Sequence, residues 1–162
     1  MKLEASAARL WKRAPLEERR AAAAAFWKQP SEDLIGTAFG AIARSRRMRP
    51  QVVRTLDEET RVRALAAILD PGEPLAAGLL VALHVADRRP LLTAFLDGAG
   101  LAHEDGILPE EGETRTISVD QARKGLAALT QFPPEQAALY LNTLWLQDPE
   151  RWSALEELEE PG

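Results

Sequence analysis

Two histidines and two nearby aspartates have the types and spacing of metal ligands. His84 and Asp87 are three residues apart, so in a helix they would share a face and offer one nitrogen and one oxygen ligand. His103 and Asp105 could add a second pair of the same kind. Two His and two carboxylates suit zinc, iron or manganese. If the fold joins the pairs, this set predicts a metal- or small-ligand-binding enzyme.

We favour a structural interpretation of the same residues. Their spacing matches no metal motif, since His103-Glu104 is not followed by a second His four residues later. His84 is then a partly buried core residue with one satisfied ring nitrogen, and Asp105-Gly106 makes a tight turn.

Other catalytic motifs are missing from the sequence. It contains no G-x-S-x-G motif, no phosphate-binding loop and no G-x-G-x-x-G pattern after a strand. It also contains no cysteine, which excludes a thiol nucleophile, a disulfide scaffold and Cys-ligated zinc or iron–sulfur sites. We therefore expect no catalytic activity and no cofactor.

A basic run is the second candidate site, and it consists of Arg44, Arg46, Arg47, Arg49 and Arg54. No acidic residue lies between Asp33 and Asp57. Such a run could bind the phosphates of a nucleic acid, another polyanion or an acidic partner. The run lacks aromatic residues for base stacking, and the sequence pI is about 5.2, so nucleic acid is the weaker alternative.

The charge distribution offers another explanation for these arginines. Residues 1–63 hold 14 Lys and Arg against 8 Asp and Glu, whereas residues 64–162 hold 6 against 17. The arginines could therefore form a solvated face or pair with the acidic half of their own chain. Trp11, Trp27, Trp145 and Trp152 lie near the two ends of the chain. We expect them in the core, although an exposed Trp could anchor a partner.

The composition indicates the scaffold that must position these residues. The 162 residues include 28 Ala and 24 Leu, about a third of the chain, which favours helices over sheets. A hydrophobic content of 46 % excludes a disordered chain, and the length fits one domain. The longest uncharged apolar run, Leu75 to Ala86, is shorter than the roughly 20 residues of a membrane helix. Charged residues near the N-terminus argue against a targeting peptide, so we expect a cytoplasmic protein.

Proline, glycine and capping residues predict an all-α fold of about eight or nine short helices in a single compact domain, 1–162. The expected starts lie near Leu3, Pro15, Ser31, Asp57, Leu75, Pro90, Ser118, Pro133 and Asp148, and Pro50 starts a further short helical piece through Leu56. Residues 98–117 hold four glycines and predict a loop or small hairpin, and 156–162 predict a frayed acidic tail.

A weak internal repeat suggests an alternative architecture. Residues 15–27 and 57–69 align at an offset of 42, which is compatible with HEAT-like helical hairpins. A third copy near position 101 is missing, so we favour an irregular bundle. Abundant amphipathic helices and missing catalytic motifs together predict a helical protein-interaction or structural module. Its partner would be another protein or a second copy of the chain, with no membrane contact.

Overall fold

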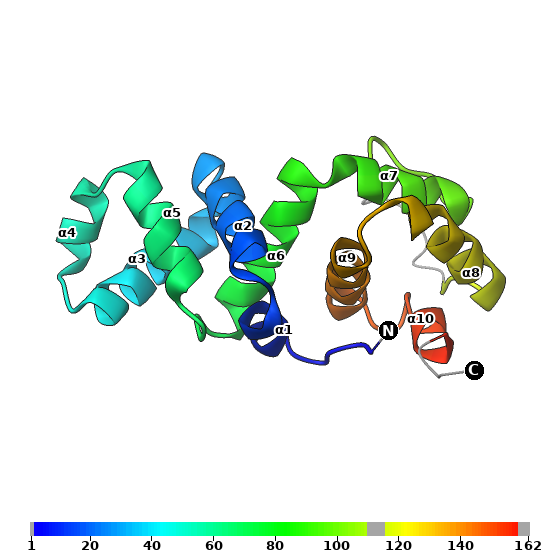
Figure 1. Ribbon diagram of the computed structural model, residues 1–162, viewed down its shortest axis with the longest axis horizontal. Helices are drawn as coiled ribbons and strands as arrows, with labels where there is room; N and C mark the ends of the chain where they lie inside the picture. The colour runs from blue at the N-terminus through cyan, green and yellow to red at the C-terminus, as the bar shows by residue number, and fades with distance from the viewer. Residues whose placement is uncertain (1, 110–115, 159–162) are drawn as a thin grey trace. The chain divides into compact units, whose positions relative to one another are not determined.

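The computed structural model describes residues 2–109 and 116–158, and these residues form an all-α fold (Figure 1). They contain ten α-helices, one short 3-10 helix and no strand, and the structure is 71 % helical. Eight of the helices have seven or more residues. The prediction of an all-α fold with about eight or nine short helices is confirmed.

The contacts divide the chain into two compact units. The N-terminal unit comprises Ser6–Asp87, and the C-terminal unit comprises Arg88–Gly162 together with Met1–Ala5. The chain therefore passes between the units at two places. The expected single domain stays a prediction. Within the described residues, no helix is both long enough and apolar enough to cross a membrane.

Six helices form the N-terminal unit. They are α1 (Ala7–Arg13), α2 (Leu16–Lys28), α3 (Glu32–Arg46), α4 (Pro50–Thr55), α5 (Glu58–Ala67) and α6 (Glu73–Asp87). α2 packs against both α5 and α6, and α3 contacts α4, α5 and α6. α5 begins 42 residues after α2, and α6 begins 41 residues after α3. The aligned segments thus correspond to α2 and α5, with α4 inserted between α3 and α5, and the HEAT-like array stays a prediction.

α1 is held on the N-terminal unit by one tryptophan and one carboxylate. The Trp11 side chain is fully buried, and its indole N–H donates to the Ile68 carbonyl at 2.7 Å. The Glu73 carboxylate accepts hydrogen bonds from the Ser6 hydroxyl at 2.6 Å and from the N–H groups of Ala7 and Ala8 at 2.7 and 3.0 Å. The first turn of α6 therefore satisfies amide groups at the start of α1 that have no partner within that helix.

The C-terminal unit contains α7 (Arg89–Gly98), α8 (Val119–Ala128), a 3-10 turn (Leu129–Gln131), α9 (Pro134–Gln147) and α10 (Ala154–Glu157). Phe95 is fully buried in its core, with ring centroids 5.6 Å from Tyr140 and 6.0 Å from Trp152. A Cβ atom at Gly125 would lie 2.6 Å from Phe95 Cε2. The bare backbone of Gly125 thus lets α8 approach Phe95 closely.

The first residues of the chain belong to this C-terminal unit. The Glu4 N–H donates to Asn142 Oδ1 at 2.6 Å, and the Asn142 amide donates to the Ala138 carbonyl within α9. Leu3 packs against the core of the unit. The N-terminal segment is therefore docked on α9.

Helix starts agree with the sequence in most places. Ser118 and Gln121 form the predicted capping box of α8, and Asp57 accepts the Thr60 N–H at the start of α5. Ser31 stands at the N-cap of α3, but its side chain makes no capping bond there. The first helix begins at Ala7 rather than near Leu3, because Ser6 caps it and the preceding residues dock on α9.

The glycine-rich segment contains the predicted small turn. Glu104 and Ile107 form one isolated antiparallel bridge, and their backbone N–H groups donate to each other's carbonyls. Between them, Asp105 and Gly106 have φ values of 51° and 88°, as a hairpin turn with two left-handed central residues requires. Residues 110–115 and 159–162 lie outside the described residues. Glu156 and Glu157, assigned by the sequence to a frayed tail, belong to α10.

Candidate functional site

The four predicted metal ligands divide between the two units. His84 and Asp87 lie at the end of α6, where His84 is buried and Asp87 is exposed. The Nδ1–H of His84 donates to the Leu80 carbonyl at 2.7 Å, one helical turn earlier. His84 is thus a core histidine with a satisfied ring nitrogen, as the structural interpretation predicts.

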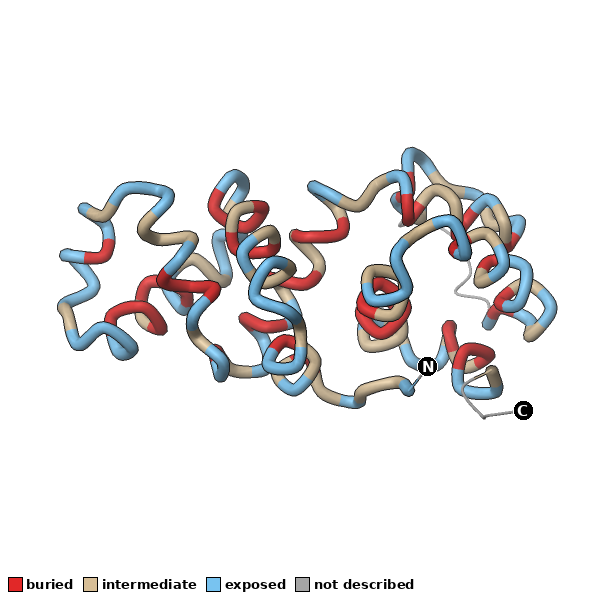
Figure 2. Tube along the Cα trace, viewed as in Figure 1, coloured by how far each residue is buried: buried red, intermediate tan, exposed pale blue. Residues whose placement is uncertain are grey.

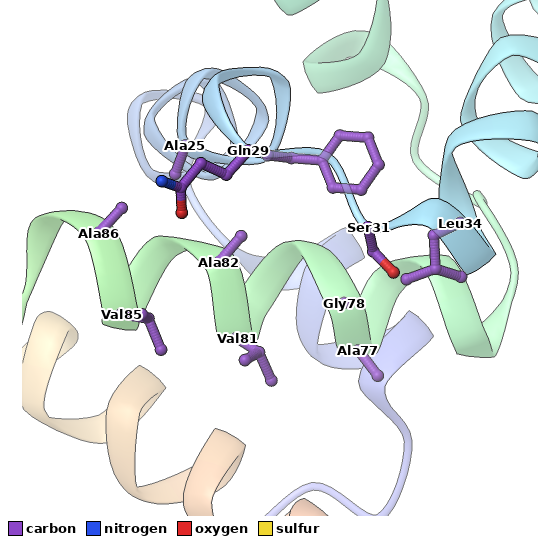
Figure 3. Close-up of a pocket in the computed structure, with 11 residues that line it drawn as sticks. Ala25, Gln29, Ser31, Leu34, Ala77, Gly78, Val81, Ala82, Val85 and Ala86 are labelled. Atoms are coloured by element: carbon purple, nitrogen blue, oxygen red, sulfur yellow. The ribbon is translucent and has the colours of Figure 1, made fainter. Parts of the chain in front are cut away.

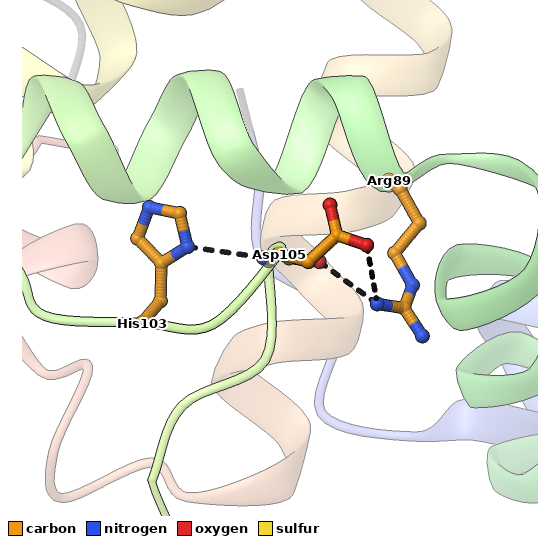
Figure 4. Close-up of polar contacts among 4 residues, drawn as sticks. Arg89, His103 and Asp105 are labelled. Carbon is orange, nitrogen blue, oxygen red and sulfur yellow. Dashed lines mark hydrogen bonds and ion pairs between the residues drawn. The ribbon is translucent and has the colours of Figure 1, made fainter.

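His103 uses both ring nitrogens inside the C-terminal unit. Its Nδ1 accepts the Gly106 N–H at 3.0 Å (Figure 4). Its Nε2–H donates to Asp97 Oδ1 at 2.6 Å. The imidazole therefore ties the 104–107 turn to the last turn of α7. Both ring nitrogens of His103 are thus engaged in hydrogen bonds within the C-terminal unit.

Asp105 is engaged on the other side of this turn. Arg89 Nη1 donates to the Asp105 carbonyl at 2.9 Å and to its carboxylate at 3.2 Å (Figure 4). A hollow of about 700 Å³ lies beside the turn and is lined by Arg89, Ala102, His103, Glu104, Asp105, Ile107, Leu108 and Pro109. Asp97 and Arg89 are partners that the sequence analysis missed. No local motif links either residue to the turn.

Within residues 2–109 and 116–158, no group of three or more His, Asp or Glu side chains is arranged to hold a metal ion. His103 and Asp105 each contribute to the 104–107 turn through a separate contact, and His84 is bonded inside α6. These contacts favour structural roles for both histidines, and the four-residue metal set remains an untested prediction.

The predicted basic run is brought together where α3 ends and α4 begins. Arg44 and Arg46 lie in the last turn of α3, Arg47 follows it, and Arg49 precedes α4. All five arginines, including Arg54 of α4, are exposed. Figure 2 colours most of the backbone around α4 as exposed. Among the described residues, none of the five forms an ion pair with a carboxylate. We call this set the arginine surface.

A ladder of rings and guanidinium groups anchors one edge of the arginine surface. The Arg54 guanidinium lies over the Phe39 ring at 5.4 Å, and the Phe39 and Trp27 rings are 5.3 Å apart. On the far side, the Arg61 guanidinium lies over Trp27 at 5.0 Å. This ladder joins α4, α3, α2 and α5. Arg54 is thereby held in place by a ring rather than by a carboxylate.

An apolar groove lies in the N-terminal unit. It has a volume of about 410 Å³ (Figure 3) and is lined by Ala25, Phe26, Gln29, Ser31, Leu34, Ala77, Gly78, Val81, Ala82, Val85 and Ala86. These residues come from α2, the turn after it, α3 and α6, and none of them is charged. A Cβ atom at Gly78 would collide with Leu34 Cδ1, so the missing side chain lets Leu34 rest directly on α6.

The tryptophans are divided evenly between the units. Trp11, Trp27 and Trp152 are buried, as predicted, with exposed fractions of 0, 8 and 2 %. Trp145 is half-buried against the C-terminal core, and its indole N–H donates to Glu156 Oε1 at 2.9 Å. No Trp among the described residues is exposed as an anchor for a partner.

Comparison of the chain with protein-family models, with curated proteins and with solved structures gives no match in any of the three. Functional inference therefore rests on the arginine surface, the apolar groove and the turn at His103.

Proposed function

We propose that the chain is a helical protein-interaction module that takes up an apolar, helical segment of a partner protein. The observation that carries this proposal is the groove between α2, α3 and α6 (Figure 3). Its volume of about 410 Å³ falls within the range of roughly 300–1,000 Å³ that is typical of binding pockets. Its lining carries no charge, so it favours an occupant that presents apolar side chains.

The small residues of the lining support a helix as the occupant. Ala82 and Ala86 are four residues apart along α6 and therefore lie on one face of that helix, next to Gly78, which Leu34 covers. The two alanines span about 6 Å, or a little over one helical turn. Alanines leave room for large aliphatic side chains, and a partner helix would offer these at positions i, i+4 and i+7.

The test is a selection of helical peptides from a displayed library against the protein and against groove variants. Ala82→Phe fills the groove, and Ala86→Glu places a charge at an exposed groove residue. We expect the selection to yield peptides with Leu or Ile at positions i and i+4. Their affinity for both groove variants should be at least about tenfold lower than for the original protein, because one or two buried aliphatic contacts are lost.

Ala67→Phe is the matched control, because Ala67 is an exposed alanine of α5 that does not line the groove. It should leave the affinity unchanged, and thermal unfolding of all three variants should show that they fold. Selected peptides that bind the groove variants as tightly as the original protein would contradict the proposal, as would a selection that yields no binder.

A further inference from the structure

The arginine surface is a second feature that calls for a partner, and it differs from the groove in charge and in position. Its five guanidinium groups lie within 11 residues of chain, Arg44 to Arg54, and all are exposed. On the N-terminal side of the run, the nearest acids in the sequence are Glu32 and Asp33, which lie at the opposite end of α3, roughly 20 Å away along the helix. On the other side, the Asp57 carboxylate already caps α5 by accepting the Thr60 N–H.

The backbone at Arg47 adds an independent observation. Arg47 ends α3 in the left-handed conformation, with φ 52° and ψ 48°, and the N–H groups of Arg47 and Met48 both donate to the Ala43 carbonyl. Glycine is the usual residue at this position, because a side chain destabilises the left-handed conformation. Arginine thus stands where a glycine would stabilise the fold, which suggests that the guanidinium serves a purpose other than stability.

The surface also includes an exposed aliphatic side chain. Val52 of α4 is 44 % exposed and lies between Arg49 and Arg54 in the sequence. No exposed aromatic residue lies among the five arginines, since Phe39 is buried beneath Arg54. Phosphate groups make no use of an apolar contact, and single-stranded nucleic acid requires rings for stacking. Arginine is enriched at protein interfaces, where an apolar side chain can also be buried.

We infer that the arginine surface binds an acidic segment of another protein chain, in which Asp or Glu residues flank an aliphatic side chain. Each guanidinium can donate two parallel hydrogen bonds to a carboxylate, and the aliphatic residue would pack on Val52. Such a segment would bring the negative charge that this part of the chain lacks. The inference does not depend on the groove, because the two surfaces share no residue.

Fluorescence anisotropy with defined probes tests this inference on the full chain. The probes are a labelled peptide of Glu and Leu, the same peptide with Gln in place of Glu, and a random-sequence RNA. We expect the Glu–Leu peptide to bind most tightly of the three probes. Its affinity should fall as salt is added, because the contacts are charge pairs. The triple variant Arg46→Gln, Arg47→Gln, Arg49→Gln should bind this peptide with an affinity lower by about tenfold or more.

Two further variants separate the parts of the surface. Val52→Thr keeps the shape of the side chain but adds a hydroxyl. It should therefore lower the affinity for the peptide without changing the salt dependence of binding. Arg47→Gly should lower the affinity for the peptide about two- to fivefold and raise the unfolding temperature of the protein by about 2–4 °C. A purely structural role of Arg47 would not move stability and affinity in opposite directions.

The matched control is the double variant Arg20→Gln, Arg63→Gln, which removes two exposed arginines of the same unit from outside the surface. It should keep the affinity for the peptide. Tighter binding of RNA than of the peptide, lost in the triple variant, would overturn the inference in favour of a nucleic acid. Equal binding of the Gln peptide, or no binding at low salt, would also overturn it. Self-association that the triple variant abolishes would support it, with a second copy supplying the acidic segment.

Discussion

The carboxylate of Glu73 joins the start of α6 to the start of α1. Hydrogen bonds from Ala8, Ser6 and Ala7 lower the pKa of the Glu73 carboxyl below its ordinary value of 4.5. Glu73→Gln removes the charge but keeps the size of the side chain. We expect it to destabilise the protein at neutral pH by about 1 kcal/mol, the usual magnitude for a lost helix cap, because the group is exposed and screened by solvent.

The pH dependence of this difference follows from the direction of the pKa shift. A lowered pKa in the folded state means that the carboxylate stabilises the fold above its unfolded pKa. This contribution is lost as the pH falls through the folded pKa. The stability of the protein and of Glu73→Gln in urea unfolding should therefore differ at neutral pH and converge as the pH falls through the lowered pKa of the Glu73 carboxyl. A difference that persists unchanged in acid would show that the charge is not responsible.

Two glycines in helices allow a matched pair of substitutions. Gly125→Ala would place a methyl group 2.6 Å from Phe95 Cε2. We therefore expect this overpacking to lower the free energy of unfolding by about 1–3 kcal/mol. A Cβ atom at Gly36 of α3 would have no neighbour within 4 Å, so Gly36→Ala should stabilise the helix by roughly 0.5–1 kcal/mol. Thermal unfolding measures both changes. Equal signs for the two substitutions would contradict the packing assigned to Gly125.

The sequence predicts residue roles well where a role depends on near neighbours in the chain. His84 bonds to Leu80 four residues before it, and Asp105-Gly106 forms a turn with its own flanking residues. Asp97 lies on the preceding helix, so its bond to His103 depends on how the loop folds back. The orientation of the arginines is a similar case. Their spacing indicates a cluster, but only the packing around it shows that no described carboxylate reaches it.

At the scale of helices, Arg19 of α2 carries an inter-helix contact with α5. Its Nη1 donates to the Ala66 carbonyl at 3.0 Å, near the end of α5. Arg61, the residue aligned with Arg19 in the repeat, lies over Trp27 of α2. The two equivalent arginines thus both act in the packing of α2 on α5, through different groups.

Arg19→Met should therefore lower the free energy of unfolding by about 1 kcal/mol, since it leaves a carbonyl at a helix end without this donor. Arg20→Met is the control, because Arg20 is the exposed neighbour and should change stability by less than about 0.5 kcal/mol. Denaturant titration of the two variants measures the difference. Equal losses for both would mean that the Ala66 contact adds nothing to stability.

The predicted helices agree with the structure where capping residues and prolines mark their starts, as at Ser118 and Pro50. The agreement is poorer at the two ends of the chain. Leu3 fits a helical stripe but packs on the C-terminal core instead, and the residues after Pro149 form turns before α10 begins at Ala154. In both places contacts with distant residues override the local pattern.

At the scale of the whole molecule, residues 2–5 are the part whose position least follows from the sequence. They precede the N-terminal unit in the chain, yet Leu3 and Glu4 contact the C-terminal unit. Deleting residues 2–5 removes the half-buried Leu3 from the C-terminal core and the Glu4–Asn142 hydrogen bond from α9. We expect the C-terminal unit to lose about 1–3 kcal/mol of stability.

Hydrogen exchange measures this effect separately for each unit. Amides of α9 should exchange faster in the deletion variant, while amides of α2 should keep their rates. Lys2→Ala provides the control, because Lys2 is exposed and its substitution should leave both units unchanged. Faster exchange in α2 with no change in α9 would contradict the docking of this segment on α9.

The bond between Glu4 and Asn142 also bears on how the protein is made, because 138 positions separate its two residues. At a synthesis rate of about 5–20 residues per second, Glu4 precedes Asn142 by roughly 7–28 s. All residues of the N-terminal unit are complete well before that time. Residues 2–5 are therefore synthesised long before the helix on which they dock, and they reach their final position only once α9 has been synthesised.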